Sequence, residues 1–161
     1  MAVDPEEYRR AMRQWATGVS VVTTSLNGVR HGMTVNSFTS VSLTPPLLLV
    51  SLERSTRTHR LIKQAGFFGV TILSHSQQEV SDCFAGRHTE LEDRFYNLKT
   101  HVLVTGAPFV DGGLAYVDCK VVSSYEVGTH TLFIGEVLAL ELTDLHQPLI
   151  YYNRTYKGLQ K

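Results

Sequence analysis

A two-residue turn signal constrains the fold of this 161-residue chain more than any other feature. Asn27 and Gly28 stand in the middle of the stretch VSVVTTSLNGVRHGMTV. Asn-Gly is the pair best suited to a type I′ turn, because both central residues of that turn need positive φ. The sequence therefore predicts a β-hairpin whose strands cover about residues 18–25 and 29–35.

Further extended runs follow the hairpin, and most of them are separated by short turn signals. They are residues 37–43, the apolar run 47–53, residues 67–74, two long runs at 114–127 and 131–143 joined at Gly128, and a short extended piece in the tail PLIYYNRTYKGL. Six to eight strands linked mostly by hairpins indicate an antiparallel barrel or a strongly coiled sheet. We expect a mainly β fold with two or three helices packed outside.

Capping residues mark the predicted helices. Asp4 is a good N-cap with Pro5 at the first helical position, and the apolar spacing through Trp15 predicts a helix that ends at Gly18. A second helix is expected from a cap at Ser55 or Thr56 to Gly66. A capping box from Ser76 to Glu79 predicts a third, short helix that ends at residues 84–86, and residues 87–100 are expected to form a loop with a helical turn near 92–98.

Composition narrows the class of protein. Apolar residues make up 43% and charged residues 19% of the chain, and the net charge is formally zero, which is typical of a folded globular protein and gives no basic footprint for nucleic acid or anionic lipid. We expect one domain over residues 1–161, without a signal peptide or membrane span, in the cytoplasm. Cys83 and Cys119 are expected to be reduced core thiols, and the spacing of the seven histidines predicts no zinc site.

Common nucleotide and hydrolase motifs are absent from the sequence. It contains no GxGxxG after a strand, no GxxxxGK[ST] phosphate loop and no GxSxG elbow. A Rossmann module and a Walker-type phosphate site are therefore not expected, and nothing supports serine hydrolysis.

The stretch HGMTVNSFTSVSLTPPLLLVSL, residues 31–52, carries an unusual number of hydroxyls beside a predicted buried strand. A solvated loop is one interpretation, and the lining of a flat polar ligand is the other. The stretch is one of six that resemble segments of the short-chain flavin reductases, the FMN-binding split-barrel family that supplies reduced flavin to two-component monooxygenases. The others are WATGVSVVTT (15–24), FFGVTILS (67–74), Gln77 to the FAG of 84–86, LAYVDCKVV (114–122) and GTHTLFIGEV with PLIYY (128–152).

This resemblance implies a mainly β antiparallel split β-barrel with a few flanking helices, assembled as a homodimer with flavin near the subunit interface. It also implies an NAD(P)H-dependent oxidoreductase that reduces FMN or FAD by hydride transfer from NADH or NADPH to flavin N5, and a separate monooxygenase that receives the reduced flavin. The cofactor carries such chemistry, so the protein needs small hydrogen-bond donors that hold two stacked rings.

The site residues carry over from the family segment by segment. Thr34, Val35, Asn36 and Ser37 match the segment that lines the isoalloxazine ring and ribityl chain. The ribityl phosphate is expected near Ser51, Leu52, Ser55, Thr56 and Thr58, where a helix N-terminus would offer free N–H groups, and Arg54 or Arg57 could add charge. Ordinary turn and capping chemistry is the alternative explanation for these residues.

The resemblance also implies roles for a corner at residues 84–86 and for two single residues. Phe84, Ala85 and Gly86 would contact flavin through their backbone, unless they form only a helix end over a core Phe. His130 would lie at the nicotinamide as an orienting group or proton donor, although Thr129 replaces the family's usual Asp. Tyr152 would pack over the same pocket, or serve only as an interface or core aromatic.

Other activities fit the same resemblance. The chain could be a flavin-binding electron-transfer or redox-sensing module, or a ferric or corrin reductase with tightly held flavin. An oxidase of the pyridoxamine-phosphate type is less favoured, since no basic cluster for a second phosphate stands near the tail. The sequence leaves open FMN against FAD, NADH against NADPH, and the partner oxygenase with its substrate.

Overall fold

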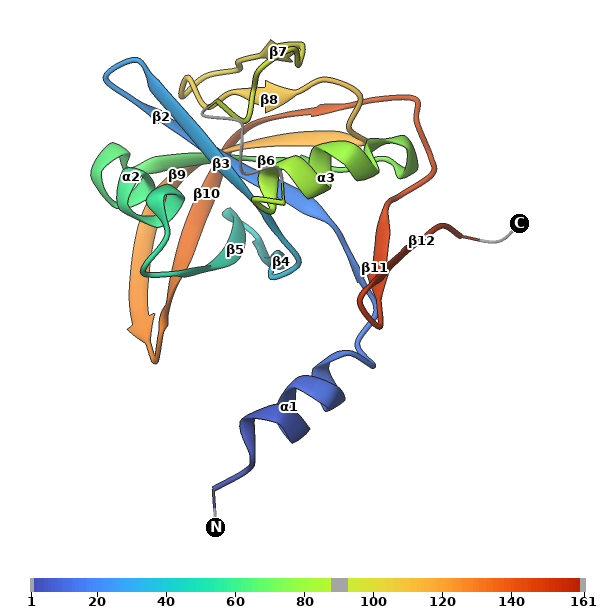
Figure 1. The fold of residues 1–161 in the computed structure, drawn as a ribbon. Helices are drawn as coiled ribbons and strands as arrows, with labels where there is room; N and C mark the ends of the chain where they lie inside the picture. The colour runs from blue at the N-terminus through green and yellow to red at the C-terminus, as the bar shows by residue number, and fades with distance from the viewer. Residues whose placement is uncertain (1, 88–92, 160–161) are drawn as a thin grey trace.

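The computed structural model describes residues 2–87 and 93–159, and its main element is a seven-stranded antiparallel sheet (Figure 1). In spatial order the strands are β3 (Val29–Val35), β2 (Ser20–Leu26), β6 (Phe67–Ile72), β9 (Ala115–Val127), β10 (His130–Leu142), β5 (Pro46–Glu53) and β4 (Thr39–Leu43). The predicted class, mainly antiparallel β with flanking helices, is confirmed. The sheet is not closed into a barrel, because β3 and β4 form its two edges in the hydrogen-bonding order.

The predicted hairpins set the register of this sheet. Asn27 and Gly28 have φ of 50° and 79°, as a type I′ turn requires, and Leu26 pairs with Val29 across the turn. The long β9–β10 hairpin turns at Gly128 with φ of 56°, and two register shifts interrupt its pairing. Such irregularities increase the local twist of a sheet.

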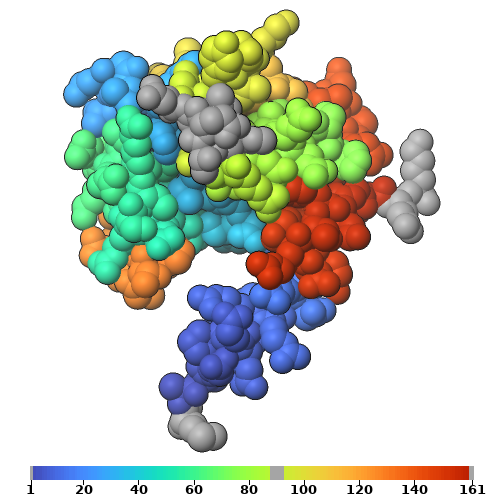
Figure 2. Space-filling view, viewed as in Figure 1, coloured from blue at the N-terminus to red at the C-terminus, as the bar shows by residue number. Residues whose placement is uncertain are grey.

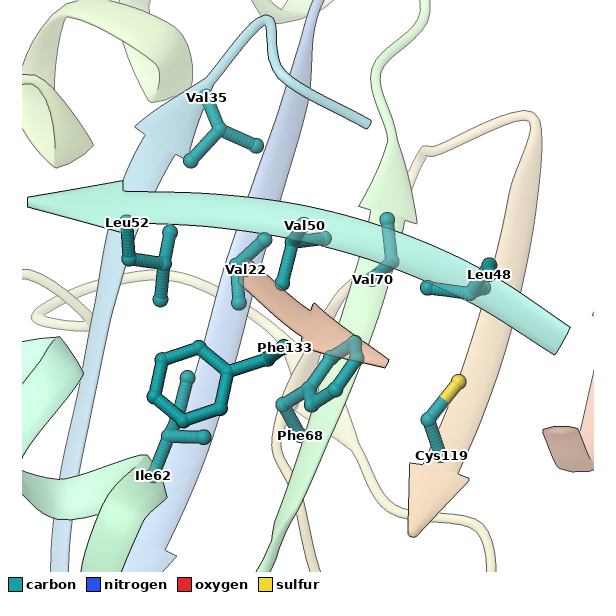
Figure 3. Packing of buried hydrophobic residues seen from close by; sticks show 10 residues of the cluster. All are labelled: Val22, Val35, Leu48, Val50, Leu52, Ile62, Phe68, Val70, Cys119 and Phe133. Carbon is teal, nitrogen blue, oxygen red and sulfur yellow. The ribbon is translucent and has the colours of Figure 1, made fainter. Parts of the chain in front are cut away.

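The main core lies within the curved sheet, whose strands supply nine of the ten buried side chains of the cluster, and Ile62 of α2 (Arg57–Ala65) is the tenth. Figure 3 shows Phe68 and Phe133 beside Ile62 of that helix, with Val22 and Leu52 from two other strands. All of these side chains are fully or almost fully buried. A second cluster lies under α3 (Gln78–Phe84), and Cys83 and Cys119 are both buried, as predicted for core residues.

The helix N-termini follow the sequence signals only in part. Thr56 caps α2, accepting a hydrogen bond from the backbone N of His59, and Gly66 ends that helix in the left-handed conformation, as predicted. The predicted capping box that starts at Ser76 is wrong. The backbone N–H of Ser74 donates a hydrogen bond to the side-chain oxygen of Gln77 at 3.1 Å, and a 3-10 turn (His75–Gln77) precedes α3. Ser74 therefore starts this segment two residues before the predicted cap.

The N-terminal helix begins where predicted but ends early. Asp4 accepts from the backbone N of Glu6 and Glu7 at the start of α1 (Pro5–Met12). The helix stops at Met12 rather than continuing to Gly18, because β1 (Thr17–Gly18) pairs with β11 (Ile150–Tyr152). None of its residues is buried, so the predicted apolar face is not packed into a core within the described residues, and α1 projects from the body (Figures 1 and 2).

Two small sheets complete the fold. The tail forms a hairpin of β11 and β12 (Thr155–Lys157), not one extended piece, and β1 joins it. Between α3 and β9 the chain forms β7 (Thr100–His101) and β8 (Phe109–Val110), which the sequence analysis did not predict. The expected turn near 92–98 is present over residues 94–97, while residue 92 lies outside the described part. None of the described helices has the length and apolarity needed to cross a membrane.

Candidate functional site

Two cavities meet at the C-terminal end of β3. The α2 cavity, about 370 Å³, lies between β3, the first turn of α2, the end of α3 and Arg94. The α3 cavity, about 180 Å³, lies between residues 34–36, α3 and the β11–β12 hairpin. Thr34 and Ala85 line both cavities, so the two spaces are adjacent.

The α2 cavity has the features of an anion site. Thr56, Arg57 and Thr58 of the α2 N-terminus line it. The backbone N–H groups of Arg57 and Thr58 precede the first intrahelical bonds, and helix N-termini with such free donors attract anions. The guanidinium of Arg94 adds a second positive charge to the lining.

His31 lies in the wall of the α2 cavity, with its Nδ1 2.8 Å from the hydroxyl oxygen of the buried Thr58. Burial, followed by the positive charges of three arginines, lowers the pKa of His31 from its ordinary 6.5 to about 4, against an opposing contribution from Asp93. The three arginines are Arg94, Arg57 and Arg60. The ring is therefore neutral at pH 7, and this wall of the cavity owes its positive potential to arginines.

Arg94 joins β3 to the end of α3. Its Nη1 donates to the carbonyl oxygens of Gly32 and Phe84, both at 2.9 Å. These charge-assisted bonds fix the distance between the strand and the helix end. Phe84 is fully buried and meets Phe95 edge to face, with ring centroids 4.9 Å apart.

Two glycines allow this close packing. A Cβ on Gly32 would lie 2.9 Å from both Phe84 Cε1 and Thr23 Cγ2, so the strand can approach the Phe84 ring only without a side chain there. Gly86 has φ of 76°, and a Cβ on it would lie 3.1 Å from Arg94 Nη2. The corner formed by residues 84–86 is thus held by packing and by Arg94.

Hydrogen bonds organise the α3 cavity. Thr34 Oγ1 donates to the carbonyl of Ser81 at 2.6 Å, which ties β3 to α3. The hydroxyl of Tyr156 lies 2.8 Å from Ser81 Oγ and donates to Asp82 Oδ1 at 2.8 Å. Burial is the largest cause that raises the pKa of Tyr156 above its ordinary value. The phenol therefore stays protonated at neutral pH.

The polar side chains of residues 36 and 37 have two different roles. Asn36 is exposed and lines the α3 cavity. Ser37 Oγ instead donates to the carbonyl of Ser51 at 2.8 Å and accepts from its backbone N at 3.2 Å. These bonds attach the segment to β5, whose Leu52 side chain is fully buried in the core. Ser37 and Leu52 can therefore offer a ligand little besides their backbone.

The remaining predicted residues lie outside the two cavities. His130 is exposed at the start of β10, where it pairs with Glu53, two residues along β5 from Ser51. Thr129 Oγ1 lies 2.9 Å from its Nδ1, so a hydroxyl contacts the ring where the family usually has a carboxylate. The hydroxyl of Tyr152 donates to Gln14 Oε1 at 3.1 Å.

In sum, the structure gathers about half of the predicted residues around the two cavities. Those that line them are Thr34, Val35, Asn36, Thr56, Thr58, Phe84 and Ala85. Those that do not are Ser37, Ser51, Leu52, Ser55, Gly86, His130 and Tyr152.

Sequence reasoning missed several lining residues, among them His31, Arg94 and Tyr156. His31 is the first residue of the stretch 31–52 that was singled out, and Tyr156 is the third tyrosine of the tail, so both had a visible context. Arg94 lies in the polar segment 87–100, where no pattern distinguished it. Within the described ranges, no group of three or more His, Cys, Asp or Glu side chains could hold a metal ion.

The donor set fits a flat ring that carries a phosphate on a flexible chain. The α2 cavity offers helix N–H groups and arginines for the phosphate, and the α3 cavity offers the Asn36 amide beside Tyr151 and Tyr156 for a ring. Flavin mononucleotide has this distribution of charge and aromatic surface.

Comparisons with known proteins agree with this chemistry. Residues 12–160 match the family described as Flavin reductase like domain. An NADH-dependent flavin reductase from Rhodococcus sp is 39% identical over 162 residues, covering 98% of this chain and 88% of the relative. The reductase subunit HsaB of a flavin-dependent monooxygenase from Rhodococcus jostii is 32% identical, covering 99% of this chain and 80% of the relative. The Streptomyces globisporus NADH:FAD oxidoreductase SgcE6, solved in complex with NAD and FAD fragments, superposes with a TM-score of 0.90 at 31% identity, covering 99% of this chain and 97% of that one.

Proposed function

Because this chain belongs to the family of flavin reductase like domains, we propose that it is an NADH-dependent flavin reductase. It reduces FMN or FAD with NADH and releases the reduced flavin to a separate flavin-dependent monooxygenase. The single observation that carries the proposal is the pair of adjacent cavities, which combines an anion site with a ring site in a family of this activity. The names of similar proteins support flavin, NADH and the monooxygenase partner.

The flavin phosphate binds in the α2 cavity and the ring extends toward the α3 cavity. When bound, flavin supplies the chemistry, since its N5 accepts a hydride from C4 of the nicotinamide. The N–H groups of Arg57 and Thr58 and the guanidinium of Arg94 hold the phosphate. Asn36 and Tyr156 border the ring, and Tyr156 keeps its proton there. The protein thus orients the two rings and excludes water without a strong acid or base.

His130 serves the nicotinamide side of the site, oriented through Nδ1 by Thr129. It lies on the sheet face opposite the core, since its partner Glu53 and the next residues on that face, Ser51 and Leu132, alternate with buried ones. We expect His130→Ala to raise the KM for NADH more than the KM for flavin. An equal rise in both constants would place His130 outside the nicotinamide site.

The same sheet face supports the proposal of a homodimer. Tyr125 and Val127 of β9 are both 58% exposed and pair with Leu132 and His130 of β10, so apolar side chains surround His130 on this face. A second copy that covered these residues would bury them and enclose His130. Light scattering during gel filtration tests this point, with twice the 18.0 kDa chain mass expected. A cytoplasmic location is part of the proposal, because Cys119 is a buried free thiol.

A steady-state assay that crosses NADH and NADPH with FMN, FAD and riboflavin tests the activity. We expect NADH oxidation that depends on added flavin, with preference for a phosphorylated flavin over riboflavin because of the α2 cavity. No turnover with any pair, together with flavin that stays bound through purification, would refute the reductase and favour an electron-transfer module.

A further inference from the structure

The arm formed by α1 and residues 13–16 encloses a second space against the β11–β12 turn, which we call the arm cleft. One part is a cavity of about 270 Å³ lined by Arg9, Arg13, Trp15, Tyr151 and Arg154, among others. A neighbouring cavity of about 500 Å³ shares Arg13 and Asn153 with the first. The arm and the C-terminal hairpin lie next to each other in Figures 1 and 2.

Two hydrogen bonds fasten the arm to the turn. The backbone N of Asn153 donates to the carbonyl of Arg13 at 3.1 Å, and the Tyr152 hydroxyl donates to Gln14 Oε1. The cleft is thus a defined feature of the chain.

Positive charge gathers in the arm cleft without matching acids. Arg9 pairs with Glu6, but Arg13 and Arg154 form no ion pair within the described residues. The larger cavity has one acid in its lining, Glu7. Unneutralised guanidinium groups that face one space favour an anionic ligand, and arginine suits phosphate oxygens in particular.

The positive φ of Arg154 indicates that its side chain has a role beyond forming the turn. Asn153 and Arg154 have φ of 46° and 64°, as in the Asn27–Gly28 turn, where the second position is glycine. The other described non-glycine residues with positive φ are all asparagines. Glycine would adopt this conformation at Arg154 without the steric cost that a Cβ brings. The backbone alone therefore does not explain an arginine here.

The arm cleft also offers an aromatic surface and a connection to the ring site. Trp15, the one tryptophan of the chain, is 71% exposed, and an indole face can stack on a nucleobase. Asn36 and Tyr151 line both the arm cleft and the α3 cavity. A dinucleotide that stacks on a ring in the α3 cavity can therefore extend into the cleft.

We propose that the arm cleft binds the adenosine diphosphate moiety of a dinucleotide, with Arg13 and Arg154 on the diphosphate and Trp15 stacked on the adenine. This inference rests on the proposed function, which places the flavin ring beside Asn36 and the nicotinamide of NADH against that ring. NADH and FAD both carry such a moiety, but the chain of the flavin leaves its ring toward the phosphate in the α2 cavity. NADH is therefore the expected occupant, and the experiment distinguishes it from FAD.

The kinetic test compares each dinucleotide with its mononucleotide. Reduced nicotinamide mononucleotide has the reacting ring of NADH without the adenosine phosphate, and FMN is the corresponding partner of FAD. We expect Arg154→Gly to lower the preference for one dinucleotide over its mononucleotide about tenfold. The change should be in KM and not in kcat, because the contact is remote from the reacting atoms. If Arg154→Gly changes the ratio of the KM for reduced nicotinamide mononucleotide to the KM for NADH, the cleft binds NADH. If it changes the ratio of the KM for FMN to the KM for FAD, the cleft binds FAD.

Two controls separate this effect from damage to the fold. Arg154→Gly relieves the positive-φ position, so its thermal midpoint should equal or exceed that of the unaltered protein. Lys157→Gln removes a charge three residues away that lines neither part of the cleft, and it should leave both ratios unchanged.

Fluorescence of Trp15 gives a readout that does not need turnover. Titration with ADP should quench Trp15 in the unaltered protein, with a dissociation constant that rises about tenfold in Arg154→Gly, whereas adenosine should bind much more weakly. Quenching by ADP in a protein without flavin reductase activity would support the cleft and refute the proposed function. An active reductase with no ADP quenching and no change in either ratio would overturn the cleft assignment.

Discussion

Replacement of Gly32 by alanine tests how the flavin site is built. Gly32 lies in β3 directly before the segment that lines both cavities, and it faces Phe84 at the end of α3. A Cβ there would be 2.9 Å from Phe84 Cε1 and from Thr23 Cγ2, and 3.0 Å from the carbonyl of Val22. The backbone oxygen cannot move without disturbing β2, so the Phe84 ring must shift, and the corner at residues 84–86 must shift with it.

The expected cost follows from two opposing effects. Overpacking a core by one methyl costs about 1–3 kcal/mol. The loss of glycine's freedom in the unfolded chain returns about 0.4–1 kcal/mol. A net destabilisation of about 1–2 kcal/mol remains, which lowers the thermal midpoint of a chain of this size by roughly 2–8 °C. The KM for flavin should rise, because Phe84 and Ala85 line the α2 cavity.

Thermal denaturation and steady-state kinetics measure the two effects. Gly18→Ala is the matched control, since a Cβ on Gly18 meets nothing within 4 Å and should leave both values nearly unchanged. Phe84→Leu in the Gly32→Ala background should recover part of the lost stability, because the smaller side chain removes the ring edge. A Gly32→Ala protein with an unchanged midpoint and unchanged flavin KM would refute the packing argument.

Three further predictions concern single side chains. His31 has a folded pKa of about 4 against an ordinary 6.5, so it favours folding above pH 6.5 and loses that contribution as pH falls toward 4; His31→Asn should flatten the pH dependence of urea unfolding in this window. Arg94→Gln should weaken binding of FMN about tenfold but that of riboflavin much less, as measured by flavin fluorescence, and equal losses would contradict the phosphate role. Asp118 accepts from the backbone N of Val104 and Thr105 at 2.7 and 2.8 Å; Asp118→Asn should cost about 1–3 kcal/mol in denaturant unfolding with flavin KM unchanged, and a raised KM would contradict a purely structural role.

The local signals in the sequence predicted most of the elements. Asn27–Gly28, Gly128 and Gly66 stand where positive φ is required, and each marks a turn or helix end in the structure. These predictions succeeded because each depends on conformations available to a few neighbouring residues. The early end of α1 was not predictable in this way, since the pairing of Thr17 with Tyr151 involves residues far apart in the chain.

The site was only partly predictable for the same reason. Thr34 and Asn36 were found through a continuous segment, and the N-terminus of α2 through its cap. Arg94 has no such context, because its role depends on two carbonyl groups, in β3 and at the end of α3, that the fold brings together. Ser37 also carries a hydroxyl, yet the structure uses it to hold β5.

By itself the sequence determined the antiparallel β class, the hairpin turns and the family, because turn chemistry, capping and continuous motifs are local properties. Only the tertiary structure decided that the sheet keeps two open edges, that Arg94 and His31 form the wall of the anion site, and that the arm meets the C-terminal hairpin. Those features depend on contacts between distant segments. Side-chain packing and charge determine these contacts only in the folded chain, where residues far apart in the sequence meet.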